Sequence, residues 1–368
     1  MRLLVLAAAY PDPAGETGMY YVHSRSKYYV SEGIEVSVLN FSAKNDYVLD
    51  GIHVYTVDSY ALEVRKQEFD ILVCHAPSLR NHVSFLRKYS EMFPRIVFFF
   101  HGHEALFCSK VYPKPFWYDR HGKLRRLVQD CYDMVKLPAL RRCIEKYSPK
   151  SWFIFVSQWM YEQFLYWTKT DQSLLHDRKS IVHNSVGPLF ETLSYDRASS
   201  KDYDFITVRN SIDGSKYCID IVTDLARNNP EYTFLVVGQG KFYEFNEKPR
   251  NIVHIDRTLP HADVIRFLNK SKCALMPTRI DAQGVMACEM ATFGIPVITS
   301  DIPVCKEIFT GFDNVTFIRN DNPESNFLQA YRKITSVELM HKNRKFCSEN
   351  TVAKEVEIFR EIGGATKP

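Results

Sequence analysis

The chain has 368 residues, of which 45% are hydrophobic and 24% charged, with a formal net charge of +4. This length favours two domains of roughly 150–200 residues each. The composition is that of a soluble globular protein, and no run reaches the roughly 18 apolar residues that a membrane-spanning helix needs.

Strands and helices alternate along the first half, which predicts a parallel α/β sheet. Several strands are continuous apolar runs, as in sheets covered on both faces. The first run also resembles a short signal peptide, but the same alternation follows it directly, so we predict a strand. The predicted strands are residues 3–8, 35–39, 70–74, 95–100, 151–156 and 180–183, and the predicted helices are residues 19–31, 79–89, 123–147 and 159–167.

Residues 186–203 are polar and show no sustained period, so we predict an interdomain linker. The alternation then restarts, and two such series predict an α/β protein of two Rossmann-like domains facing each other across a cleft. The predicted domains are residues 1–187 and 188–345, followed by a helical segment, 346–368, that packs back on the first. The later strands are residues 205–208, 233–237, 252–255, 273–276 and 296–299, and the later helices are residues 216–228, 262–270, 284–293 and much of the last 45 or so.

The segment from Cys273 to Glu307 carries the most informative pattern. A buried-looking strand ends at Pro277, a polar loop follows, and the helix GVMACEMATF has Glu289 as its only charged side chain. An isolated buried carboxylate is costly, so Glu289 either meets protein donors in the core or binds the hydroxyls of a ligand. The free N–H groups at the helix start near Gly284 favour an anion such as a phosphate.

This segment resembles the nucleotide-sugar signature of retaining GT-B glycosyltransferases, in particular glycosyltransferase family 4 (glycosyl transferases group 1). The family pattern is a Glu, seven residues and a second Glu on a helix, then a small-residue turn and an apolar strand. Glu289 matches the second Glu, and GIPVITSDIPVCKE matches the tail, whereas Asp281 at the first position is one methylene shorter. The resemblance implies that Glu289 holds the ribose hydroxyls, and that Asp281 and the backbone around Gln283, Gly284 and Val285 contact the donor sugar.

Three further residues match the family in the required order. Arg209 follows a strand and Lys216 opens the next helix, which resembles the pair that grips the donor diphosphate. Cations there would stabilise the charge that develops as the nucleoside diphosphate leaves; two solvated charges are the alternative. Gly238 ends a strand in Gly-Gln-Gly, a turn beside the nucleotide in the family but a weak signal alone.

The first half offers two candidates. Gly18 closes Gly-Glu-Thr-Gly after the first strand, where the family has a glycine loop facing the donor phosphates; a plain turn is the alternative. His101 directly follows the strand IVFFF, and related enzymes place a His near the reacting sugar there. His103 and Glu104 follow at once, but two His with no third ligand are poor evidence for zinc, so we expect no metal and no cofactor.

The positive excess is concentrated between Lys110 and Lys150, with 11 basic and 4 acidic residues. A helical pattern there places Leu124, Leu127, Val128, Cys131 and Val135 on one face. The alternatives are a solvated helix with core aromatics or a peripheral surface for anionic membranes, suited to a lipid-linked acceptor. No recognition motif for nucleic acid accompanies the charge.

We therefore expect a retaining glycosyltransferase that moves a sugar from a nucleoside diphosphate sugar, with UDP favoured, to a glycan or lipid-linked acceptor in cell-surface polysaccharide assembly. The alternatives are a catalytically inactive GT-B subunit, for which Asp281 is the only hint, and another GT-B enzyme such as a sugar-nucleotide epimerase. Nine cysteines without a C-x-x-C pair favour a cytoplasmic location, with Cys74, Cys131, Cys273 and Cys288 as core residues.

Overall fold

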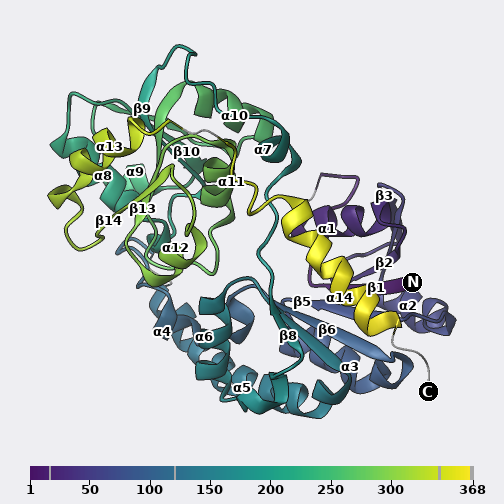
Figure 1. Cartoon of the computed structure of the whole chain (residues 1–368). Coiled ribbons are helices and arrows are strands. Elements are labelled where there is room, and N and C mark those ends of the chain that lie inside the picture. Colours follow the sequence, from purple (N-terminus) through teal and green to yellow (C-terminus); the bar gives the residue numbers. More distant parts are fainter. Residues whose placement is uncertain (16–17, 120–121, 339–340, 365–368) are drawn as a thin grey trace. The chain divides into compact units, whose positions relative to one another are not determined.

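Two parallel sheets, one in each of two units, organise the computed structural model (Figure 1). It describes residues 1–15, 18–119, 122–338 and 341–364. The first unit comprises Met1–Cys108, Asp130–Ser185 and the chain from Ser348, and the second comprises Ser109–Gln129 and Val186–Cys347. Residues 16–17 of the predicted glycine loop, 120–121 of the basic stretch and 365–368 of the C-terminal segment lie outside the described residues.

The first unit is built on an eight-stranded sheet of order β3-β4-β2-β1-β5-β6-β7-β8. Its neighbouring strands are parallel, except that β3 runs antiparallel to β4. The central strands are almost wholly buried, which explains their continuous apolar sequences. The strands are β1 (Arg2–Ala7), β2 (Glu35–Asn40), β3 (Tyr47–Leu49), β4 (Ile52–Tyr55), β5 (Ile71–His75), β6 (Arg95–Phe100), β7 (Ser151–Phe155) and β8 (Lys179–Ile181).

A helix from the end of the chain completes the core of the first unit. Val352, Val356 and Phe359 of α14 belong to the same buried cluster as the strands β1, β2 and β5, and Figure 1 shows α14, in yellow, alongside α1, in purple. The helices before residue 185 are α1 (Tyr20–Ser31), α2 (Val57–Leu62), α3 (Ser84–Tyr89), α4 (Cys108–Val111), α5 (Gly122–Tyr147) and α6 (Gln158–Thr168). The late helix α14 spans Val352–Gly364.

A buried ion pair joins α14 to α1. The Arg25 Nε donates to Glu355 Oε1 at 3.0 Å, and neither side chain is more than 1% exposed. The hydroxyl of Tyr29 donates to the other oxygen of Glu355, and the guanidinium also donates to Asn184 Oδ1 at 2.8 Å. These hydrogen bonds satisfy both charges, which is the condition under which a buried ion pair is tolerated.

The second unit holds a six-stranded sheet, in which every pair is parallel, of order β11-β10-β9-β12-β13-β14. Its core joins strand residues such as Phe205 and Val236 to the buried face of α8, which includes Val222 and Leu225. The strands are β9 (Tyr203–Ser211), β10 (Phe234–Gln239), β11 (Ile252–Ile255), β12 (Ser271–Met276), β13 (Val297–Ser300) and β14 (Val315–Ile318). The helices are α7 (Pro188–Thr192), α8 (Ile219–Asn228), α9 (Phe242–Phe245), α10 (His261–Asn269), α11 (Val285–Phe293), α12 (Pro303–Ile308) and α13 (Phe327–Thr335).

The predicted fold class is confirmed, and the structure differs from the sequence predictions in local detail. The short strands β3, β4 and β14 were not predicted. The predicted linker contains α7, anchored by the buried Phe190. Residues 109–129 group with the second unit, although the predicted first domain ran unbroken to residue 187.

None of the nine cysteines, all of which lie in the described residues, forms a disulfide. Cys74, Cys273 and Cys288 are buried as predicted, whereas the prediction for Cys131 is wrong because this residue is exposed. Cys131 lies on α5, and its predicted apolar neighbours Leu124 and Leu127 are also 65% and 61% exposed. The helical period is therefore correct, but this apolar face is turned to the solvent.

Removing the carboxylate of Glu355 tests the ion pair. In Glu355→Leu the Arg25 guanidinium stays buried without its partner, so we expect a loss of about 3–5 kcal/mol of unfolding free energy. The double variant Arg25→Met/Glu355→Leu should recover most of it. Urea unfolding of the full chain measures both, with Arg360→Met, which breaks an exposed pair with Glu32, as a control expected to lose under about 1 kcal/mol. A double variant as unstable as Glu355→Leu would contradict the assignment.

Candidate functional site

The helix α11 begins at a glycine with left-handed backbone geometry. Gly284 has φ 73° and ψ 60°, which other L-residues adopt only with strain. Its carbonyl accepts the N–H groups of Ala287 and Cys288 at 3.0 and 3.1 Å. Among the described residues, no acceptor bonds the N–H groups of Gly284, Val285 and Met286. Together with the helix dipole, these N–H groups make this end of α11 suitable for an anion.

One pocket of the second unit brings four predicted residues together: Arg209, Asp281, Gln283 and Gly284. They come from the end of β9, the loop after β12 and the start of α11. Side chains from β12, β13 and α12 complete the lining. The pocket lies where parallel strands end, which is the usual position of a ligand site in an open α/β sheet.

Asp281 has its two carboxylate oxygens in different surroundings. Its Oδ1 accepts the N–H of Ala282 at 2.8 Å and that of Gln283 at 3.4 Å, so it stabilises the loop that leads into α11. Its Oδ2 lies 3.7 Å from the place that a Cβ on Gly284 would occupy. The shorter Asp side chain therefore closes its own loop with one oxygen and keeps the other beside the N-terminus of the helix.

Arg209 and Lys216 share one aromatic neighbour, Tyr217. The guanidinium carbon of Arg209 lies 5.2 Å from the centre of the Tyr217 ring, and the Nζ of Lys216 lies 4.7 Å from it. Arg209 is 9% exposed, donates to the carbonyl of Pro277 at 2.7 Å, and has a buried Nε with no hydrogen-bond partner. Burial lowers the pKa of Arg209. Within the described parts of the chain, neither cation forms an ion pair with a carboxylate, so both charges are available to an anionic ligand.

No sequence motif marks Tyr217 as a site residue. Residues 215–217 form a single 3₁₀ turn, and Cys218 then takes a left-handed φ of 57° before α8 begins. This break separates Tyr217 from the helix, whereas the predicted helix ran unbroken from residue 216. Gly214 gives the ring its space, because a Cβ there would lie 2.8 Å from Tyr217 Cδ2.

Gly238 packs closely against the backbone of Arg209. A Cβ on Gly238 would lie 2.4 Å from the carbonyl oxygen of Arg209, a distance that no side chain tolerates. The pairing of β10 with β9 shifts register at this point. Gly238 is therefore required for the close approach of two strands beside Arg209, and its predicted contact with the donor stays a prediction.

Glu289 is 4% exposed and lies in the second turn of α11. Its Oε1 accepts the N–H of Gly187 at 3.0 Å and lies 3.8 Å from His261 Nε2. No described residue hydrogen-bonds Oε2. Burial raises the pKa of Glu289 to about 7, and the Gly187 N–H opposes that rise. Protein groups thus bind Oε1. That Oε2 binds the ribose hydroxyls stays a prediction.

His101 belongs to the first unit and forms a pair with a second histidine. His101 Nε2 lies 3.1 Å from Nδ1 of His75, a fully buried residue that the sequence analysis had missed. Asn184 also hydrogen-bonds the His101 side chain, and burial holds the pKa of both imidazoles well below its usual value. This shift favours the neutral form of both rings, in which His101 can donate or accept a hydrogen bond.

The carboxylate of Glu104 closes the turn after His101. It accepts the N–H of His101 and, at 3.0 Å with each oxygen, that of Gly102. Across the described ranges there is no cluster of three His, Cys, Asp or Glu side chains suited to a metal ion. Gly18, the other candidate in this unit, packs against the segment that follows β1, because a Cβ there would lie 2.9 Å from the Cβ of Ala9.

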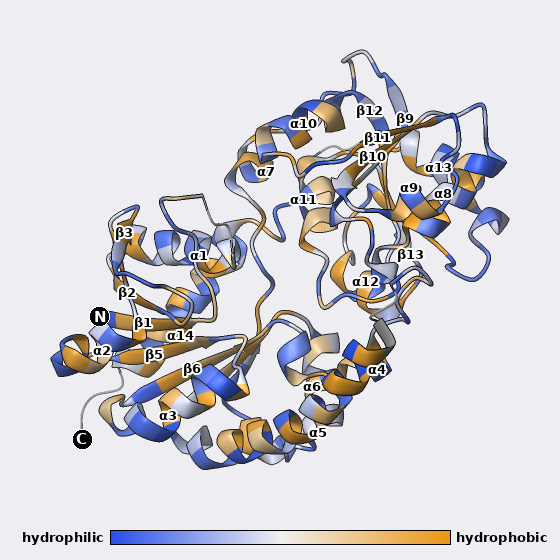
Figure 2. Cartoon of the chain, turned by 180° about the vertical axis from the view of Figure 1, so that it is seen from behind, coloured by the Kyte–Doolittle hydropathy of each residue, from blue (hydrophilic) through white to orange (hydrophobic). Residues whose placement is uncertain are grey.

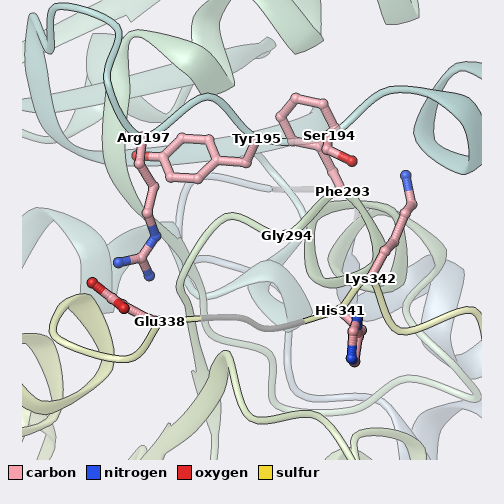
Figure 3. Close-up of a pocket in the computed structure, with 8 residues that line it drawn as sticks. All are labelled: Ser194, Tyr195, Arg197, Phe293, Gly294, Glu338, His341 and Lys342. Atoms are coloured by element: carbon pink, nitrogen blue, oxygen red, sulfur yellow. The ribbon is translucent and has the colours of Figure 1, made fainter.

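A second pocket of the second unit lies at the other end of α11, where Gly294 ends the helix (Figure 3). Two of its cations are already engaged: Arg197 donates to the carbonyl of Val337, and Lys342 donates to that of Leu193. None of the predicted site residues lines this pocket. We therefore place the candidate site at the N-terminus of α11.

The sequence of the second unit matches a known family. Residues 198–353 match the family described as Glycosyl transferases group 1, and this span includes Arg209, Lys216, Gly238 and the segment from Asp281 to Glu289. No curated protein sequence matches the chain.

Solved glycosyltransferase structures share the fold over the whole chain. Sucrose-phosphate synthase from Thermosynechococcus elongatus is 11% identical, with a TM-score of 0.72 and coverage of 99% of this chain and 100% of that one. Anabaena HepE in complex with UDP and glucose is 12% identical, with a TM-score of 0.62 and coverage of 99% and 98%. WaaG, a glycosyltransferase involved in lipopolysaccharide biosynthesis, is 16% identical, with a TM-score of 0.57 and coverage of 100% and 96%.

At these identities the structural likeness establishes the fold, and the family match in the second unit adds the activity. The chain is a glycosyltransferase of the GT-B fold. The structure contains no helix in the described residues that is long and apolar enough to cross a membrane.

Burial of Glu289 predicts a pH-dependent stability. Because its pKa is about 7 in the folded chain and ordinarily 4.5, the folded state keeps a proton that the unfolded state loses as the pH rises between these values. Stability should therefore fall across this window, by at most about 3 kcal/mol, and Glu289→Gln should not show the fall.

Urea unfolding of the wild type and Glu289→Gln at pH 5 and pH 8 measures this effect. We expect the variant to gain in relative stability at pH 8, while Glu231→Gln, at an exposed position, tracks the wild type. Parallel pH profiles for wild type and Glu289→Gln would show that the carboxylate is already ionised at pH 5.

Proposed function

We propose that the chain transfers a sugar from a nucleoside diphosphate sugar, preferably a UDP-sugar, to a glycan or lipid-linked acceptor with retention of configuration. The single observation that carries this proposal is the pocket at the N-terminus of α11, where Arg209 meets Asp281 and Gly284. The signature ending in Glu289 supports retention, and the UDP and glucose bound to Anabaena HepE support a UDP-sugar. The biosynthetic role of WaaG supports an acceptor in cell-surface assembly.

The diphosphate is the part of the donor for which the pocket is best suited. Arg209 and Gly284 line the pocket, and Lys216, outside this lining, shares the Tyr217 ring with Arg209. Two cations without carboxylate partners and three unbonded N–H groups would then be donors to phosphate oxygens. As the bond between the sugar and the diphosphate breaks, negative charge grows on the leaving group. Fixed positive groups stabilise that growing charge more than the ground state, which lowers the barrier.

The two acidic residues would act on the two ends of the donor. Glu289 would accept hydrogen bonds from the ribose hydroxyls through Oε2. Asp281 would orient the transferred sugar through Oδ2, while the departing phosphate takes the proton of the acceptor hydroxyl. In this scheme the protein contributes positioning and charge stabilisation, and it needs no metal. The role of His101 near the sugar stays a prediction.

A catalytically inactive subunit is the second candidate. The observation that favours it is the hydrogen bonding of Asp281, whose Oδ1 is already used by the loop N–H groups of Ala282 and Gln283. Release of UDP from a panel of UDP-sugars and acceptors separates the two proposals. UDP binding without release across that panel would favour the inactive subunit.

We also propose that α5 docks on an anionic membrane surface at the cytoplasmic side. Its apolar stripe is exposed, with Leu124, Leu127, Val128 and Val135 each at least 61% accessible, and Figure 2 shows orange and blue segments alternating along the helix. Exposed arginines flank the stripe. An exposed apolar face bordered by basic residues is typical of a helix that lies in a lipid interface, and it would bring the enzyme to a lipid-linked acceptor.

Replacing Glu289 tests the ribose site. We expect Glu289→Ala to weaken UDP binding about 10- to 100-fold, because hydrogen bonds to a charged acceptor are lost. Isothermal titration calorimetry on the full chain measures this, with Glu231→Ala as the control. An unchanged dissociation constant for Glu289→Ala would show that the ribose binds elsewhere.

Vesicle co-sedimentation tests the membrane surface. Reversing the exposed Arg125 and Arg142 should reduce binding to phosphatidylserine vesicles about tenfold or more, since each basic residue near such a surface contributes about 1 kcal/mol. Arg332→Glu/Lys333→Glu, at exposed positions of the second unit, is the matched control. Equal binding of wild type and Arg125→Glu/Arg142→Glu would contradict membrane docking, and a concentration-dependent dimer in gel filtration would assign the stripe to a second copy instead.

A further inference from the structure

Residues 109–119, which we call the strap, come from the first half of the chain but belong to the second unit. Phe116 and Tyr118 pack against the core of that unit. The ring of Tyr118 stacks on Phe245 with 4.7 Å between centres and 8° between planes, and Phe116 contacts Phe242 at 5.1 Å. The strap is therefore attached to the segment that follows β10, which ends beside the candidate site.

A hydrogen bond also attaches the strap to the loops that follow β9 and β10. The hydroxyl of Tyr118 donates to Asp213 Oδ1 at 2.8 Å. The carboxylate of Asp213 accepts the N–H of Lys241 as well, at 3.0 and 2.9 Å. Asp213 thus links the strap, the loop after β9 and the loop after β10. At the base of the strap, Arg126 donates to the carbonyls of Ser109 and Pro113.

This attachment holds Tyr112 beside Lys216. The Nζ of Lys216 lies 5.5 Å from the centre of the Tyr112 ring and 4.7 Å from that of Tyr217. Aromatic faces attract an ammonium group without cancelling its charge, whereas a carboxylate partner would neutralise it. Two rings can therefore order the lysine side chain and leave its full charge for a ligand.

We propose that the strap is a working part of the donor site and that Tyr112 is a positioning residue. It holds the Lys216 ammonium where the pyrophosphate of the nucleotide sugar binds. This inference rests on the proposed function, because it assigns Lys216 to the diphosphate. It adds a segment outside the family match, which begins only at residue 198.

Calorimetry with UDP and with uridine tests the inference on the full chain. Tyr112→Leu should weaken UDP binding about three- to tenfold, the range expected for a lost cation–π contact, and leave uridine binding unchanged. Tyr112→Phe, which keeps the ring, should restore most of the affinity. In a Lys216→Met background, Tyr112→Leu should have no further effect, because the group that it positions is gone.

The possible outcomes distinguish a failure of the positioning role of Tyr112 from a failure of the proposed donor site. Equal losses for UDP and uridine, or a Tyr112→Leu effect that persists in Lys216→Met, would overturn the positioning role, since either indicates general damage to the unit. Unchanged UDP binding in Tyr112→Leu would overturn it too. If Lys216→Met binds UDP as tightly as the wild type, the diphosphate assignment of the proposed function is itself wrong.

Discussion

The candidate site of the second unit depends on the contact of two cations with one phenol ring. Arg209 and Lys216 both lie within 5.2 Å of the centre of the Tyr217 ring, and no ion pair to either is found in the described chain. Both charges are therefore available to an anionic ligand, and the carboxylate of Asp281 lines the same pocket as Arg209. Glycines at two positions make the arrangement sterically feasible, because Gly214 leaves space for the ring and Gly238 for the backbone of Arg209.

Glu289 is a second charged group of this unit whose burial costs stability. A carboxylate that is 4% exposed and hydrogen-bonded through one oxygen is more costly to ionise than a solvated one. An apolar residue at this position of α11 would make the helix a better core element. The retention of a poorly compensated acid next to a helix N-terminus is typical of a functional site, where local stability is given up for chemistry. His75 is a parallel case in the first unit, since its Nε2 is buried with no hydrogen-bond partner.

The sequence predicted those features that depend on periodicity and on local motifs. The two parallel sheets, the start of α11 near Gly284 and the joint lining of one pocket by Arg209 and Asp281 all follow from such patterns. Three other features could not be predicted from such patterns. Tyr217 depends on the left-handed backbone at Cys218, which no pattern announces. His75 pairs with His101 only because β5 and β6 are neighbours. The outward direction of the α5 stripe depends on packing, since a helical period locates an apolar face without showing what covers it.

The ion pair between Arg25 and Glu355 has a consequence for how the chain comes to be folded. The arginine is synthesised before residues 186–347 of the second unit, and its glutamate only after them. Until then the guanidinium lacks the carboxylate that permits its burial, and the core of the first unit lacks Val352, Val356 and Phe359. The first unit therefore cannot reach its final packing before the second unit has been made.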